Sequence, residues 1–220
     1  MQAYFDCFSG ISGDMTLGAL IDLGAPLDWL QNELLRLPLT GFQLKVAPVV
    51  RNGIRATSVN VEIEDPSPSR DYGAIKSLLE DGDLSEGVKS NSLAAFDRLA
   101  RAEAYIHGCS VQDVHFHEVG GIDAIVDIVG TALCLEKLEV REVISSKIPI
   151  GSGFVDCQHG KLPVPAPATI EILKDAPIYG TDAAAELVTP TGAAIIAVLA
   201  KSYGVLPPMR VKKIGYGAGQ

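Results

Sequence analysis

The sequence predicts an α/β protein with a mixed sheet, a β-hairpin and flanking helices, and an α+β arrangement is the alternative. Strand-like and helix-like segments alternate along the chain. Asn52-Gly53 stands between two β-rich segments, a setting typical of a hairpin turn. A chain of 220 residues with 47% hydrophobic and 20% charged residues can bury a core of its own.

The individual elements follow from periodicity and from start and stop signals. A run of β-formers predicts the first strand, and a glycine loop leads into the first helix. In the segment 162–167, Pro163, Pro165 and Pro167 exclude a helix until residue 168. Leu93, Phe96 and Leu99 form one apolar stripe, which we expect to be core. The predicted strands are 4–8, 42–50, 54–63, 142–150 and 210–214, and the predicted helices are 14–23, 28–37, 72–79, 85–107, 122–138, 168–174 and 190–203.

Composition narrows the function classes. A net charge of −9 and the absence of any Lys/Arg run disfavour binding to nucleic acid or to anionic membranes. No apolar run could span a bilayer, and the N-terminus enters a strand instead of a signal peptide, so we expect a cytoplasmic protein. The four cysteines lack C-x-x-C spacing, so most are predicted to be reduced core residues.

The segment from His115 to Asp127 gathers imidazoles and carboxylates in a short apolar window. If 113–118 is a strand, His115 and His117 point to one side with Cα atoms roughly 6 to 7 Å apart. If a helix begins at Ile122, Asp123 and Asp127 lie one turn apart on one face. This pattern indicates metal or proton chemistry.

Simpler interpretations exist for parts of this window. Asp123 could be an ordinary N-cap, and a histidine pair can be a solvated strand edge. Asp127 differs, because apolar residues surround it on nearly every helical side and an unpaired buried carboxylate is costly. We expect something to pair with it.

Two loop-to-helix junctions could bind an anion through free N–H groups and the helix dipole. The loop 9–13 is neither a Walker A loop, because it lacks the lysine, nor a G-x-G-x-x-G motif. A cation between the anion and the nearby Asp6 and Asp14 would explain those carboxylates, and a tight turn with Asp14 as N-cap is the alternative. The candidate anion-binding residues are Ser9, Gly10, Ser12, Gly13, Thr189, Thr191 and Gly192.

The second junction has its own simpler interpretation, with Thr189 as N-cap and Pro190 at the first helical position. Elsewhere, Cys157 and His159 stand two residues apart and form a donor pair suited to nickel, copper or zinc. His107, just before Gly108, is expected only to complement a helix dipole.

Several longer motifs, in the same order, resemble the nickel insertion protein family of the nickel-pincer cofactor pathway. The resemblance covers nearly the whole chain, and a set of long motifs is far more specific than a single one. The motifs are DCFSGISGDM (6–15), HFHEVGGIDAIVD (115–127), GSGFV (151–155), HG and LPVPAPAT (159–160 and 162–169), LVTPTGA (187–193) and KIGYGAG (213–219).

The resemblance implies insertion of nickel into pyridinium-3,5-bisthiocarboxylic acid mononucleotide, a lyase-class reaction that uses CTP with manganese or magnesium and makes the cofactor of lactate racemase. Family members commonly carry a histidine-rich run where this chain has 67–72, and they are usually longer. We therefore expect 1–220 to be one N-terminal nickel-insertion domain with a helical subregion at 70–110. A C-terminal, CTP-associated half would be its partner, and we expect a homo-oligomer.

Our leading hypothesis assigns roles by donor chemistry, with His115 and His117 as first-choice nickel ligands. Glu118, Asp123 and Asp127 would support these ligands, orient the imidazoles or accept a proton. Asp6, Asp14, Cys157 and His159 are further ligand candidates. The alternatives are a metal-dependent phosphohydrolase, and a non-catalytic assembly module whose cluster is a buried ion-pair network.

Overall fold

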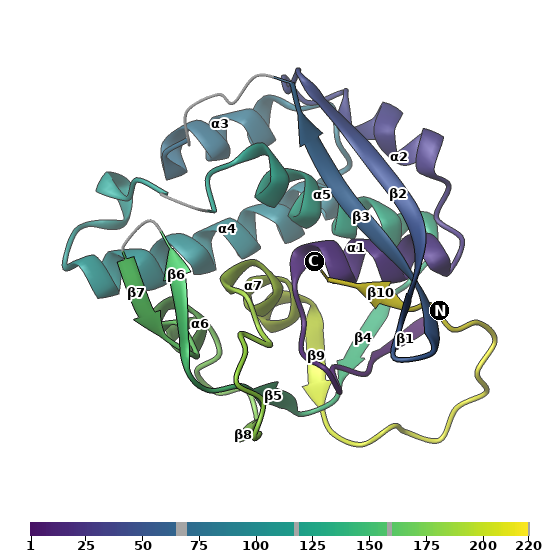
Figure 1. The fold of residues 1–220 in the computed structure, drawn as a ribbon. Helices are drawn as coiled ribbons and strands as arrows, with labels where there is room; N and C mark the ends of the chain where they lie inside the picture. Colours follow the sequence, from purple (N-terminus) through teal and green to yellow (C-terminus); the bar gives the residue numbers. More distant parts are fainter. Residues whose placement is uncertain (65–69, 117–118, 158–159, 220) are drawn as a thin grey trace.

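The computed structural model describes residues 1–64, 70–116, 119–157 and 160–219, with only the backbone of Cys157, and it confirms the α/β class (Figure 1). The helices are α1 (Gly13–Asp22), α2 (Leu27–Leu34), α3 (Tyr72–Asp81), α4 (Glu86–His107), η1 (Val111–Asp113, a 3-10 helix), α5 (Ile122–Lys137), α6 (Pro167–Ile172) and α7 (Pro190–Leu199). The strands are β1 (Gln2–Phe5), β2 (Phe42–Arg51), β3 (Ile54–Ile63), β4 (Glu142–Ser145), β5 (Ile148–Ile150), β6 (Phe154–Cys157), β7 (Gly160–Pro163), β8 (Ile178–Gly180), β9 (Ala200–Tyr203) and β10 (Gly217–Ala218). Within the described ranges, no helix has both the length and the apolar character needed to cross a bilayer.

Two small sheets organise the fold. One is parallel, in the order β1-β4-β9, and the other places β3 between β10 and β2. β2 and β3 form the predicted hairpin, in register from Phe42 opposite Ile63 to Arg51 opposite Ile54. Its turn has φ angles of 49° at Asn52 and 81° at Gly53, the left-handed pair that a two-residue hairpin turn requires. Two further pairs join β5 with β8 and β6 with β7.

Helix α1 lies at the centre of the packing, against β3, β10 and α5. Gly18 permits the close contact with β3, because a Cβ there would lie 2.4 Å from the carbonyl oxygen of Thr57. α5 buries Ile125, Val126 and Val129 in the same core. The stripe of α4 is core as predicted, with Phe96 and Leu99 fully buried. The N-terminal ends of α1 and α5 are thereby fixed relative to each other.

The strand predicted at 4–8 is β1 (Gln2–Phe5), and the helix predicted at 28–37 ends at Leu34. Three other predicted elements differ more from the structure. The strand predicted at 142–150 divides into β4 and β5, which belong to different sheets, because residues 142–145 pair with β1 and β9 whereas residues 148–150 pair with β8. The helix predicted to reach 203 ends at Leu199, because the next residues pair with β4 as β9. The segment 210–214 is exposed and irregular, and the short β10 follows it.

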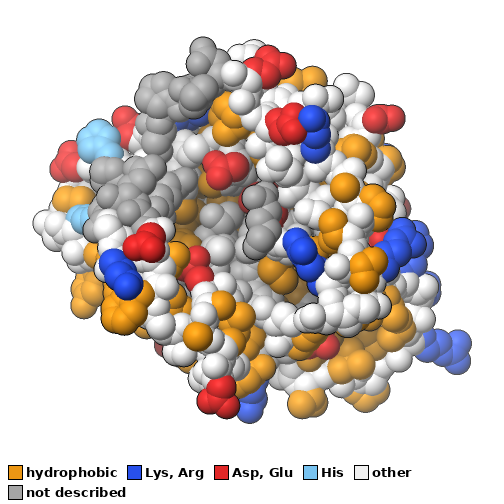
Figure 2. Space-filling model, in the orientation of Figure 1, with side chains coloured by type: hydrophobic (Ala, Val, Ile, Leu, Met, Phe, Trp, Pro, Cys, Tyr) orange, Lys and Arg blue, Asp and Glu red, His pale blue; other side chains and the backbone are white. Residues whose placement is uncertain are grey.

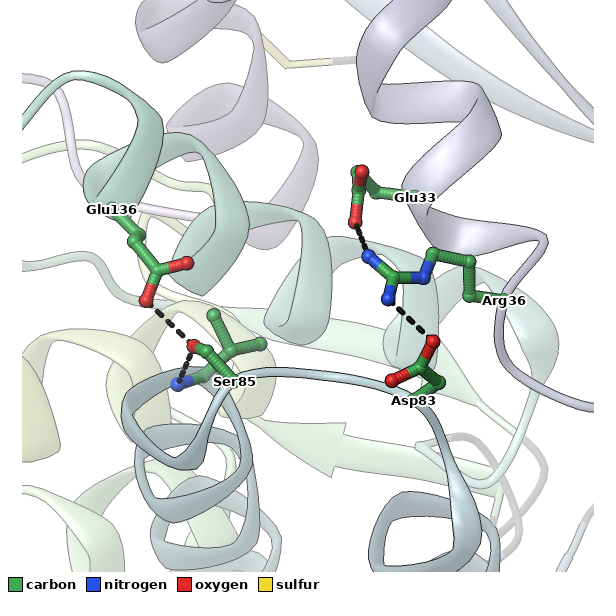
Figure 3. Close-up of polar contacts among 6 residues, drawn as sticks. Glu33, Arg36, Asp83, Ser85 and Glu136 are labelled. Carbon is green, nitrogen blue, oxygen red and sulfur yellow. Dashed lines mark hydrogen bonds and ion pairs between the residues drawn. The ribbon is translucent and has the colours of Figure 1, made fainter.

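The beginning of α4 joins two helices through a cap (Figure 3). The Ser85 hydroxyl accepts a hydrogen bond from the Val88 N–H at 3.2 Å and donates to Glu136 of α5 at 2.6 Å. Nearby, Arg36 pairs with Glu33 and Asp83, and this lowers the pKa of the Asp83 carboxyl. The Arg36 pairs are exposed and screened, so the cap contributes more to stability.

We expect Ser85→Ala to lower the free energy of unfolding by about 1 kcal/mol, because the N-cap of α4 and its bond to Glu136 are both lost. Ser85→Asn is the matched control, since asparagine retains a capping oxygen and should restore most of the loss. Urea denaturation measures both variants. Equal destabilisation by the two variants would contradict the capping role.

Candidate functional site

The N-terminal ends of α1 and α7 lie side by side. The Ile11 N–H donates to the carbonyl of Leu187 at 2.9 Å, and the Thr189 N–H donates to the carbonyl of Ile11 at 3.2 Å. Ile11 and Val188 therefore form an isolated parallel bridge just before both helices begin. The two anion-binding junctions expected from the sequence, far apart along the chain, form one composite surface, which we call the paired helix start (residues 9–14 and 187–192).

Two glycines make this contact possible. Gly10 has a φ of +99°, and a Cβ there would lie 1.8 Å from the carbonyl oxygen of Leu187. A Cβ at Gly192 would lie 2.2 Å from the carbonyl oxygen of Ile11. Because real side chains cannot approach backbone atoms this closely, any larger residue at either position would push the two helix starts apart.

The caps of both helices are well defined. Ser12, not Asp14, is the N-cap of α1, and its hydroxyl accepts from the Met15 N–H at 3.4 Å. The simpler interpretation of Asp14 as N-cap was therefore wrong, although Asp14 lies in the first turn. Thr189 caps α7 by accepting from the Gly192 N–H at 3.2 Å, as predicted. Each helix start carries a partial positive charge that favours an anion.

Other family-like segments meet at the same place. Gly217 packs against the start of α1, where a Cβ would lie 1.7 Å from the carbonyl oxygen of Met15. Gly219 follows beside Met15 and Ser12, and Figure 1 shows the C-terminal end of the chain next to α1. The buried Thr169 hydroxyl donates to the carbonyl of Val188 at 3.4 Å. These contacts hold the paired helix start from the side of α6 and of the C-terminal segment.

Asp127 of α5 faces this site from the core. A Cβ on Gly13 would lie 2.3 Å from Asp127 Oδ2, so the carboxylate rests directly against the first residue of α1. Its Oδ1 is inaccessible to solvent and has no hydrogen-bond partner among the described residues, although the residue as a whole is partly exposed. Burial raises the pKa of the Asp127 carboxyl well above its usual range, and the charges of Asp14 and Asp123 raise this pKa further.

The remaining acids have different surroundings. Asp123 lies in the first turn of α5 and is solvent-exposed, while Gly121 is the N-cap, so the N-cap interpretation of Asp123 was wrong. Asp6 is exposed after β1. Its neighbour Cys7 is buried, and burial raises the pKa of this thiol to about 11, so Cys7 stays protonated at neutral pH. Figure 2 shows acidic side chains around the centre of the face where α1 begins in Figure 1.

His115 has an environment that the sequence did not predict. Val111–Asp113 forms η1, and His115 makes only an isolated bridge with Asp71, so the described part of 113–118 is not a regular strand. An open pocket of about 130 Å³ borders His115, and the other residues that line it are His107, Cys109, Asp113 and Val114.

Cys7 and Cys134 are buried, in line with the prediction that most cysteines are core residues, whereas Cys109 is exposed. His107 ends α4 before the left-handed Gly108, as expected, yet it also faces the pocket beside His115. Sequence reasoning missed both pocket residues, although their short distance from His115 along the chain was a usable signal.

Three predicted residues, His117, Glu118 and His159, and the side chain of Cys157 lie outside the described residues. In the described ranges, no three His, Cys, Asp or Glu side chains form a ready-made metal site.

We expect Asp127→Asn to stabilise the protein at neutral pH and to change little near pH 4. Because the folded-state pKa is raised, the folded protein binds this proton more tightly than the unfolded chain, and stability falls as pH rises from about 4 through the raised pKa. Removing the charge should add on the order of 1 kcal/mol at about pH 7.5. Urea denaturation at a series of pH values in EDTA measures the difference. The same pH dependence in both proteins would show that this charge is not buried.

Comparison with known proteins matches the family model described as nickel insertion protein over residues 3–220. A protein of Geotalea uraniireducens named for nickel insertion is 53% identical over 218 residues, covering 98% of this chain and 56% of the relative. The pyridinium-3,5-bisthiocarboxylic acid mononucleotide nickel insertion protein of Acetivibrio thermocellus is 47% identical over 228 residues, covering 99% of this chain and 56% of the relative.

The chain thus spans a little over half the length of these relatives. No solved structure matches the chain. The family model covers nearly every residue, and three of the motifs, 6–15, 187–193 and 213–219, meet around the paired helix start together with Asp127 and Thr169. The chain belongs to the nickel insertion protein family.

Proposed function

We propose that this chain takes part in inserting nickel into pyridinium-3,5-bisthiocarboxylic acid mononucleotide, the substrate in the name of the Acetivibrio thermocellus relative. The product would be a nickel-pincer nucleotide of the kind used by lactate racemase. The reaction would belong to the lyase class and would depend on CTP with manganese or magnesium, bound through the C-terminal half of the family. Without that half the chain would be inactive. A cytoplasmic location and homo-oligomeric assembly stay predictions.

The single observation that carries this proposal is the paired helix start. A mononucleotide presents one phosphate, and two adjacent helix N-termini offer convergent N–H donors for it. Hydroxyl groups lie at both junctions, so a phosphate bound between the two loops would have donors from each. The phosphate-binding residues in this proposal are Ser9, Gly10, Ser12, Gly13, Thr189, Thr191 and Gly192.

Nickel binds more tightly to nitrogen or sulfur donors than to oxygen donors, and the side chains of the paired helix start offer mainly oxygen. We assign this role to His115 and His117, and the pocket beside His115 brings Cys109 close to the same imidazole. Cys157 and His159 remain a second donor pair. The segment 115–121 leads directly into α5, so nickel held there would be delivered at the end of the helix that carries the carboxylates.

Formation of a nickel–carbon bond releases a proton from the pyridinium ring. Asp123 is exposed in the first turn of α5, so it can accept this proton and pass it to solvent. Glu118, just before α5, is the second candidate acceptor. The same two acids could orient the metal-bound imidazoles by accepting their second ring N–H.

We expect Thr191→Val to raise the KM for the mononucleotide several-fold with little change in kcat, because a hydroxyl is lost from the phosphate site. The assay combines this chain with the C-terminal half, CTP, manganese, nickel and the mononucleotide, and detects the metallated product by mass. Thr131→Val on α5 is the matched control, since it makes the same substitution at a buried hydroxyl that has no hydrogen-bond partner among the described residues. Failure to form any product in the wild-type reaction would overturn the proposed function, and an unchanged KM in Thr191→Val would remove Thr191 from the site.

We expect the double variant His115→Ala/His117→Ala to bind nickel at least tenfold more weakly, because two imidazole ligands are lost. Isothermal titration with nickel measures the affinity, and circular dichroism checks that the fold is retained. Cys109→Ser tests the pocket neighbour separately. Unchanged nickel affinity in the double variant would exclude these ligands.

A further inference from the structure

In the part of the chain that the structure describes, no hydrogen-bond donor pairs with the buried oxygen of the Asp127 carboxylate. Oδ1 is buried without a hydrogen-bond partner, and Oδ2 rests against Gly13. An ionised carboxylate in such a place is costly unless a proton, a cation or several donors neutralise it. A cation bound to the Asp127 carboxylate would therefore relieve this cost.

Asp14 adds a second carboxylate to the same place and is held in position. Its Oδ1 accepts hydrogen bonds from the Ser12 hydroxyl and from the Met15 N–H, the latter at 2.8 Å. These bonds fix the orientation of the carboxylate, and Asp14 is only half-buried. Asp14 and Asp127 come from different helices, and the Asp127 carboxylate rests against Gly13, the residue next to Asp14.

The donor set identifies the class of cation. Carboxylate and hydroxyl oxygens are hard ligands that suit magnesium or manganese, whereas soft metals take thiolates and imidazoles. Magnesium is commonly held by only one or two carboxylates, with waters and phosphate oxygens completing an octahedron. Two carboxylates are thus sufficient, and the described residues hold no ready-made group of three ligands.

We propose that Asp14 and Asp127 together bind one hard divalent cation at the beginning of α1. The buried Oδ1 of Asp127 and the oriented carboxylate of Asp14 are its protein ligands, and Asp123 adds negative charge from the next turn of α5. The cation lies beside the N–H groups of the paired helix start, where it would also contact a bound phosphate. That last role rests on the proposed function, whereas the cation site itself does not.

The test uses manganese(II) as the probe, because it prefers oxygen ligands and its free form is counted by electron paramagnetic resonance. The chain is titrated with manganese(II), alone and with inorganic phosphate. We expect one bound ion in the wild type, at least tenfold weaker binding in Asp127→Asn and in Asp14→Asn, and tighter binding when phosphate is present. Asp81→Asn, an exposed acid at the end of α3, removes the same charge elsewhere and should bind manganese like the wild type.

Thermal unfolding with magnesium gives a second measurement that does not depend on turnover. Magnesium should raise the Tm of the wild type and of Asp81→Asn, and it should leave the Tm of Asp127→Asn unchanged. Wild-type affinity for manganese in both Asp127→Asn and Asp14→Asn would overturn the proposal, as would the absence of a bound ion in the wild type. Neither measurement involves nickel or the mononucleotide, so either proposal can fail without the other.

Discussion

The close backbone contact between the loop at Gly10 and the loop at Gly192 is the constraint on which the candidate site depends. It brings the first turns of α1 and α7 together although they are far apart in sequence, and it leaves no space for a Cβ at either glycine. The bonds of Ile11 to Leu187 and Thr189 then fix the register of the two loops. Without this contact the two helix dipoles would act separately, and neither junction alone would differ from an ordinary capped helix.

A second constraint is energetic. The apolar neighbours of Asp127 on α5 contribute to the core, while the buried Oδ1 of Asp127, which has no partner among the described residues, raises the energy of the folded state at neutral pH. A sequence optimised only for stability would not place an acid against Gly13. Local conflicts of this kind are expected at functional sites, because a ligand can relieve them. The conflict at Asp127 is thus stronger evidence for a ligand than the acidic composition of the surface.

The sequence predicted those elements whose signals are local. Asn52-Gly53 predicted the hairpin, Thr189-Pro190 predicted the start of α7, and the apolar surroundings of Asp127 predicted its burial. The partner expected for Asp127 is not found for its buried Oδ1 among the described residues. What failed depended on partners distant in sequence. Residues 200–203 have a helical pattern, yet their pairing with β4 makes them a strand. Likewise, no local signal shows that the loops at Gly10 and Gly192 touch, or that Asp127 and not Asp6 lies against α1.

The two groups of donors in this chain differ in chemical softness, and this difference has a consequence for metal insertion. Oxygen ligands at Asp14 and Asp127 favour a hard cation, while the imidazoles and the thiol around His115 favour nickel. If one site served both metals, nickel would displace the hard cation, because divalent nickel binds most ligand sets more tightly than manganese or magnesium. If both proposals hold, separate donor sets would let the protein hold the phosphate through a hard cation while nickel is bound by other ligands. A metal-inserting enzyme needs this separation, because the metal being transferred must leave its protein ligands while the nucleotide stays bound.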